Sequence, residues 1–155
     1  MGECEDVGGV VRALGETMGR IAAAVSGPAR ALEAGEWTAG EILAHLRGCA
    51  DVWPETIAAM LNAEEPELPL RAPREWARKM GYARLDFEAS FQAFAAQRAG
   101  LLDLLSSLPA AAWERGARIG GRRHTVFSQV RRLALHEQIH CEQLEARLEG
   151  GARRV

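Results

Sequence analysis

Apolar residues recur at three- and four-residue steps along nearly the whole chain, and this spacing is typical of amphipathic α-helices. The strict alternation that marks a half-buried β-strand is absent. The N-terminal segment shows the pattern at Val7, Val10, Val11, Leu14, Met18, Ile21, Ala22 and Val25. A length of 155 residues suits one domain with its own hydrophobic core. The sequence therefore predicts an all-α fold in a single domain over residues 1–155.

Breaks in the periodicity place the first two helices. A Ser-Gly-Pro sequence at 26–28 ends the first one. The second is predicted to begin at Thr38, which forms a capping-box pattern with Glu41. Its inner face would carry Ile42, Leu46, Cys49, Trp53, Ile57 and Met60. The segment 64–69 contains two prolines and cannot continue a helix, so we expect a loop there.

The second half of the chain predicts two further long helices. The third runs from around residue 73 or 82 to residue 106, with Phe87, Phe91, Phe94, Leu101, Leu102 and Leu105 on one side. A loop over 116–123 then leads to Thr125, the predicted N-cap of the last helix. A Gly-Gly pair at 150–151 is predicted to end that helix. Four helices of about 18 to 25 residues favour a four-helix bundle.

The composition gives little reason to expect a macromolecular partner. Apolar residues make up 48% of the chain and charged residues 26%, and the formal net charge is −2. Such a balance favours neither nucleic acid nor a membrane as a partner. No signal peptide and no apolar stretch of about 20 residues is visible. The three cysteines are widely spaced and do not suggest a disulfide framework, so we expect a reduced, cytoplasmic protein.

The chemistry of the chain is concentrated in three of its four histidines. His136 and His140 are four residues apart on the last predicted helix, so both imidazoles project from one face and can reach one ion. His45 sits at the border of the apolar face of the second helix. Together they predict a three-nitrogen site for one divalent metal. Zinc or nickel suits these ligands best, with iron or manganese as further alternatives.

The segment His136-Glu137-x-x-His140 also matches the HExxH pattern of zinc metalloproteases, in which the glutamate is the general base. A protease of that kind needs a third ligand downstream, and residues 141–155 contain no histidine and no predicted strand. Glu137 instead falls near the centre of the apolar arc, where a buried carboxylate requires a partner. Arg98 is the predicted partner. Glu137 is read either as half of a structural ion pair or as a catalytic base near the metal.

Other reactive side chains have simpler interpretations. Cys49, one turn beyond His45, is either a fourth metal ligand or a small core residue, and the core role is favoured. Cys141 is assigned to packing, and His124 to a solvent-exposed loop. The four tryptophans are expected to be core or rim anchors. An arginine cluster would attract an anionic substrate or a thiol, or would simply form a solvated face; its members are Arg118, Arg122, Arg123, Arg131 and Arg132.

Three segments resemble the DinB-like (YfiT-type) superfamily, in order along the chain. The first is Glu36-Trp37-Thr38 together with residues 41–46, which end in His45-Leu46. The second is residues 94–98, which precede the leucine run at 101–105. The third extends from His124 through His136 and His140 to Leu144. The resemblance implies a four-helix bundle with one crossover connection, often a homodimer. It also implies a metal held by His45, His136 and His140. Family members with known activity include thiol-dependent transferases and a mycothiol-dependent maleylpyruvate isomerase.

Three histidine ligands leave an open coordination position, which is typical of a catalytic site. The sequence therefore favours a metal-dependent enzyme, either a thiol-dependent transferase or a hydrolase, that acts on a small molecule. The alternative is a non-catalytic metal-binding or stress-response protein. A third interpretation is a dimeric interaction module with a vestigial site.

Overall fold

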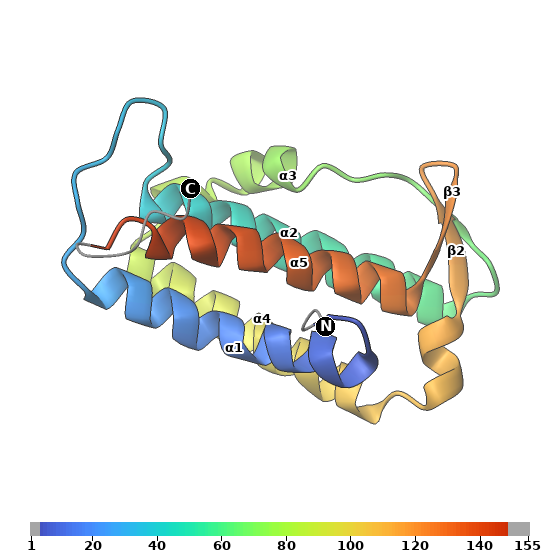
Figure 1. Cartoon of the computed structure of the whole chain (residues 1–155). Coiled ribbons are helices and arrows are strands. Elements are labelled where there is room, and N and C mark those ends of the chain that lie inside the picture. The colour runs from blue at the N-terminus through green and yellow to red at the C-terminus, as the bar shows by residue number, and fades with distance from the viewer. Residues whose placement is uncertain (1–3, 149–155) are drawn as a thin grey trace.

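Four long helices dominate the computed structural model, which describes residues 4–148 (Figure 1). They are α1 (Val7–Ser26), α2 (Ala39–Asn62), α4 (Phe87–Ser107) and α5 (Val126–Glu145). Helices α1 and α4 form one layer, and α2 and α5 form the other. The predicted four-helix bundle is confirmed.

The helices are not joined in a simple up-and-down order. In Figure 1, α2 and α4 run in the same direction, and α1 and α5 run in the opposite one. The chain must therefore return along the length of the bundle between α2 and α4. This connection contains β1 (Glu67–Leu68), α3 (Pro73–Met80) and the 3-10 turn η1 (Tyr82–Arg84). It is the crossover that the family resemblance implies.

Capping side chains fix where the long helices begin. The Thr38 hydroxyl accepts a hydrogen bond from the backbone N–H of Glu41 at 3.1 Å, as the sequence predicts. Thr125 caps α5 and forms a reciprocal capping box with Ser128. These two threonines set the helical register of the segments that carry the histidines.

Two helix boundaries differ from the prediction. The third predicted helix is two separate helices, because Gly81 adopts a left-handed conformation with φ 69° and ends α3. Helix α5 ends at Glu145 rather than at the Gly-Gly pair, which lies outside the described residues. Beyond this end the chain turns, and the Arg147 carbonyl accepts a hydrogen bond from the Arg30 backbone N–H at 2.8 Å.

The predicted loop 116–123 is mostly a β-hairpin, so the expectation of no strands was wrong. Strands β2 (Gly116–Ile119) and β3 (Arg122–Thr125) pair antiparallel, and β1 joins β2 in parallel. Gly120 and Gly121 have φ values of 57° and 83°. Positive φ at both central residues is the requirement of a tight two-residue hairpin turn. The 3-10 turn η2 (Ala110–Glu114) connects α4 to this hairpin.

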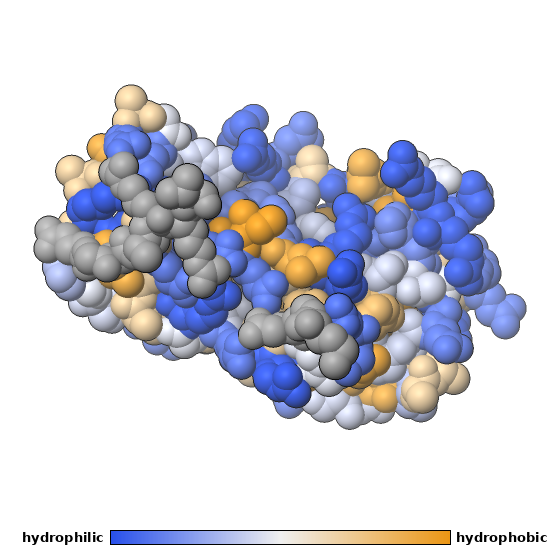
Figure 2. All heavy atoms as spheres, in the orientation of Figure 1, coloured by the Kyte–Doolittle hydropathy of each residue, from blue (hydrophilic) through white to orange (hydrophobic). Residues whose placement is uncertain are grey.

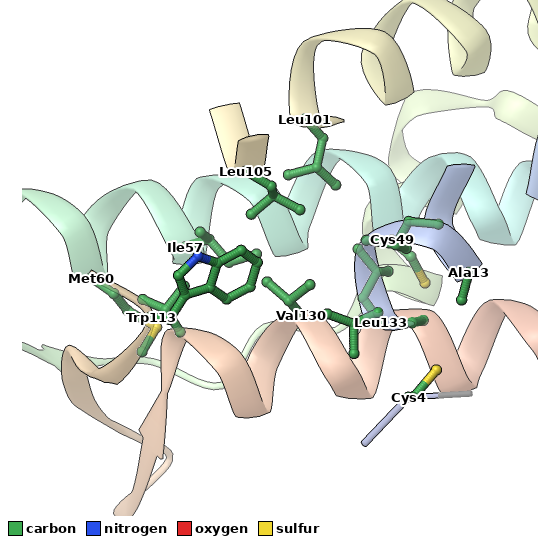
Figure 3. Close-up of a cluster of buried hydrophobic side chains, with 14 of the residues drawn as sticks. Cys4, Ala13, Cys49, Ile57, Met60, Leu101, Leu105, Trp113, Val130 and Leu133 are labelled. Atoms are coloured by element: carbon green, nitrogen blue, oxygen red, sulfur yellow. The ribbon is translucent and has the colours of Figure 1, made fainter. Parts of the chain in front are cut away.

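The core fills the space between the two layers. Figure 3 shows Trp113 between Met60 and Ile57 of α2 and Leu105 of α4, with Leu101 further along α4 in the same cluster. All of these side chains are at most 5% exposed. A second buried cluster centred on Phe94 fills the other half of the bundle. This packing holds α2 and α5 in fixed register.

Helix α3 lies closely against α2. A Cβ atom on Gly48 would lie 2.5 Å from the carbonyl oxygen of Pro73, so only glycine permits this approach. The Asp51 carboxylate accepts hydrogen bonds from Trp76 Nε1 at 2.8 Å and from the Tyr82 hydroxyl. The crossover connection is therefore fixed to the helix that carries His45.

The surface in Figure 2 is mostly polar, with an apolar patch over the middle of α5. That helix carries Ile139, which is 62% exposed. None of the helices in the described part of the chain combines the length and the apolar character that a membrane span requires.

Candidate metal centre

The bundle brings the three predicted histidines together. His45 comes from α2, and His136 and His140 come from successive turns of α5. One ligand atom from each lies within 4.8 Å of the others, and the Nε2 atoms of His45 and His136 are 2.8 Å apart. His45 and His140 are each 8% exposed, and His136 is half-buried.

This arrangement fits a divalent metal. Ligand nitrogens about 2.0–2.1 Å from a tetrahedral zinc ion lie roughly 3.3 Å apart, a spacing that small side-chain shifts would reach from nitrogens that lie within 4.8 Å of one another. His140 Nδ1 donates a hydrogen bond to Gln143 Oε1 at 2.9 Å, which leaves Nε2 with a free lone pair. Histidine ligands of metals are commonly oriented by such a bond from the second ring nitrogen.

The surroundings of the histidines favour neutral imidazoles. The pKa values of His45 and His136 are lowered to about 4, mainly by burial and in smaller part by the positive charges of neighbouring histidines and of Arg74. A neutral imidazole is the form that binds a metal.

Two tryptophans and an arginine enclose the cluster. The Trp37 ring stacks on His140 with centroids 6.3 Å apart, and Trp53 lies 5.9 Å from His136 on the other side. The Arg74 guanidinium lies 4.6 Å from the centre of the Trp37 ring. Trp37, His45 and Arg74 line a pocket of about 300 Å³. The cluster therefore has an adjacent space for a small molecule, with a cation at its edge.

Glu137 faces away from this pocket into the core, where Arg98 meets it as predicted. Arg98 donates to both carboxylate oxygens, to Oε1 at 2.6 Å and also to Oε2. The Thr17 hydroxyl donates to Oε1 at 2.8 Å. Glu137 is 1% exposed and Arg98 is 2% exposed. The structural ion pair is thus confirmed, while the role of Glu137 as a base stays a prediction.

The cysteines are buried. Cys49 is fully buried, and its Sγ lies 3.8 Å from His45 Nε2. Burial raises the pKa of the Cys49 thiol to about 12 and that of Cys141 to about 11. A thiol with so high a pKa is a core group in the absence of a metal.

The remaining predicted residues do not form one site. His124 lies in β3 and is half-buried, so the expectation of an exposed loop residue was wrong. In the predicted arginine cluster, Arg118 and Arg123 are partners across the β2–β3 hairpin, whereas Arg131 and Arg132 lie on α5. Arg123 pairs with Glu65 at 2.8 Å, Arg131 donates to the Cys4 carbonyl, and Arg132 lies over the Trp53 ring. The positive charge at the histidine pocket comes instead from Arg74 and Arg78 of α3, which the sequence alone did not single out.

Comparisons with known proteins agree with the fold described above. The sequence profile of the DinB superfamily matches residues 16–144. Among solved structures, YfiT from Bacillus subtilis, described as a probable metal-dependent hydrolase with an unusual four-helix bundle topology, aligns with a TM-score of 0.75. The two share 18% identity over 96% of this chain and 90% of that one, a level that establishes the fold alone. No curated protein matches the chain.

Proposed function

This chain belongs to the DinB superfamily, whose profile spans residues 16–144, and on that premise we propose that it is a divalent-metal-dependent enzyme. The observation that carries the proposal is the convergence of His45, His136 and His140 beside a pocket of about 300 Å³. Three nitrogen ligands leave a coordination position open for a reactant. Zinc and nickel are the preferred ions, with iron and manganese as alternatives.

A divalent ion in this site would supply Lewis acidity and would lower the pKa of a water or thiol that binds it. The chain's own residues have separate tasks. Gln143 holds the His140 ring in the orientation that directs Nε2 to the cluster. Trp37 and Trp53 cover the histidines from two sides and reduce the access of bulk water.

The reaction we propose is hydrolysis or transfer to a low-molecular-weight thiol, in both cases on a small molecule. The description of YfiT as a probable metal-dependent hydrolase supports the first. The second is supported by Arg74 at the pocket edge, because a guanidinium stabilises a thiolate or another anion.

The test is a paired screen for ester hydrolysis and thiol conjugation with zinc-loaded protein. His140→Ala should lose the activity because only two ligands remain. His124→Ala is the matched control, since it removes a histidine outside the cluster, and it should retain activity. Equal activity in wild type and His140→Ala would refute a metal-dependent reaction.

A non-catalytic metal-binding bundle, acting as a homodimer, is the second candidate. It is favoured by one observation. Glu137, which lies between His136 and His140 in the sequence, is bound on both oxygens by Arg98 and is therefore occupied in a structural ion pair. This candidate predicts stoichiometric metal with no turnover for any thiol or ester. Light scattering of the metal-loaded protein would establish whether it is a dimer.

A further inference from the structure

A second cavity, of about 360 Å³, lies on the Trp53 side of the histidine cluster. We call it the Trp53 cavity; its walls are Val52, Trp53 and Thr56 of α2, Gln129 and Arg132 of α5, Ile119, and residues 69–73. Its volume is within the range of small-molecule sites. Most of the wall is apolar, so the polar groups in it determine what it can bind.

Two of these polar groups are hydrogen-bond donors without acceptors. Gln129 is 3% exposed, and its buried Nε2 has no partner in the described structure. The buried indole N–H of Trp53 also has none. Leaving a buried donor unpaired costs about 1–3 kcal/mol, and native proteins rarely do so. Both nitrogens are covered in the present structure, so an acceptor that enters from the cavity would satisfy them after a small shift of the two side chains.

The charge of the cavity wall is positive. Within residues 4–148 Arg132 makes no ion pair, and its guanidinium lies 6.0 Å from the centre of the Trp53 ring. Arg71 is already paired with Glu55. No carboxylate is among the residues that line the cavity. A guanidinium without an ion pair, in the same wall as two neutral donors, favours an anionic acceptor, and a carboxylate matches it with two oxygens.

The cavity is also adjacent to the proposed metal centre. The Trp53 ring, which lines the cavity, lies 5.9 Å from the His136 ring at an interplanar angle of 29°. A small molecule bound in the cavity would therefore lie beside the indole ring that stacks on His136.

We propose that the Trp53 cavity binds the carboxylate of a small acid with an apolar body, and that this acid is the substrate class of the metal centre. Gln129, Trp53 and Arg132 bind the carboxylate, while Val52 and Ile119 contact the apolar body. The link to the metal rests on the proposed function, whereas binding of the acid does not require the metal.

The test is a titration with phenylacetate, followed by NMR of the four tryptophan indole N–H signals, with Trp53→Phe used to assign the Trp53 signal. A saturable shift of that signal is expected. Gln129→Met and Arg132→Gln should each weaken binding about tenfold or more, because a hydrogen bond to a charged group is lost. Gln92→Met and Arg12→Gln are matched controls on other helices and should bind as the wild type does.

The neutral analogue 2-phenylethanol should bind at least about tenfold more weakly than phenylacetate. Equal affinity for the two compounds, or no saturable shift, would overturn the proposal and would indicate that ordered water satisfies the donors. Arg132 is exposed, so its variant should fold even if Gln129→Met does not.

A further variant separates this proposal from the function proposed above. His140→Ala should lose metal yet still bind phenylacetate with the Trp53 shift. If the acid binds only to zinc-loaded protein and is insensitive to Gln129→Met, it binds at the metal and the cavity proposal is wrong. If zinc binds stoichiometrically but phenylacetate does not bind, the cavity proposal fails while the metal centre stands.

Discussion

Replacing Glu137 with glutamine should destabilise the fold severely, because this carboxylate neutralises a buried guanidinium. Glu137 is 1% exposed and Arg98 is 2% exposed, so water cannot solvate the guanidinium once its carboxylate partner is gone. The change also weakens the hydrogen bonds from Arg98 and Thr17. Removing one partner of a buried ion pair costs about 3–5 kcal/mol. The total stability of a domain is about 5–15 kcal/mol, so the loss is a large fraction of it.

Urea unfolding followed by circular dichroism measures this cost, with EDTA present so that metal binding does not add to the stability. In thermal unfolding, a loss of about 1 kcal/mol lowers the Tm of a domain of this size by about 2–4 °C. A loss of about 3–5 kcal/mol should therefore lower Tm by about 6–20 °C. Glu142→Gln, on an exposed part of the same helix, is the matched control. It should change the free energy of unfolding by less than about 0.5 kcal/mol.

A double variant, Arg98→Met with Glu137→Leu, removes both charges and should recover much of the lost stability. The reasoning would be refuted if Glu137→Gln cost less than about 1 kcal/mol, or if the double variant were no more stable than Glu137→Gln. A fully stable Glu137→Gln protein that keeps its metal but loses activity would instead support the interpretation of Glu137 as a base.

Three other expectations concern the surroundings of the site. Gly48→Ala should destabilise the protein by about 1–3 kcal/mol in thermal unfolding, because the new Cβ atom would clash with the Pro73 carbonyl oxygen of α3. Gly100→Ala is the control and should not destabilise it, because the space around Gly100 is open. Because the pKa of His45 and His136 is lowered to about 4, both should stay neutral at about pH 5.5, and NMR titration of the metal-free protein should show their imidazole signals changing near pH 4 rather than near pH 6.5. Cys49, with a thiol pKa of about 12, should resist alkylation of the native metal-free protein at about pH 8 by mass spectrometry.

The sequence predicts the bundle and the histidine cluster well, because both depend on helical periodicity. The spacing of His136 and His140 places them on one face, and the position of Glu137 in the apolar arc predicts a buried partner. That partner is Arg98, as expected. Such inferences need only the geometry of a single helix and the cost of burying a charge.

Features that depend on tertiary contacts were not predicted. The Gly-Gly pair at 120–121 is a hairpin signal, but the flanking strands are only four residues long and too short to show alternation. Gly81 interrupts the third predicted helix where the apolar pattern alone continues. Arg74 reaches the histidine pocket only because α3 packs against Gly48, a contact that no local pattern encodes.

The most direct test of the central claim is the zinc stoichiometry of the protein, purified without a histidine tag and measured by element analysis after reconstitution. The account predicts about one zinc ion per chain, lost in His45→Ala and His140→Ala but kept in His124→Ala. Wild-type protein that binds far less than one ion per chain after reconstitution, or a His124→Ala protein that loses the ion as the cluster variants do, would contradict it.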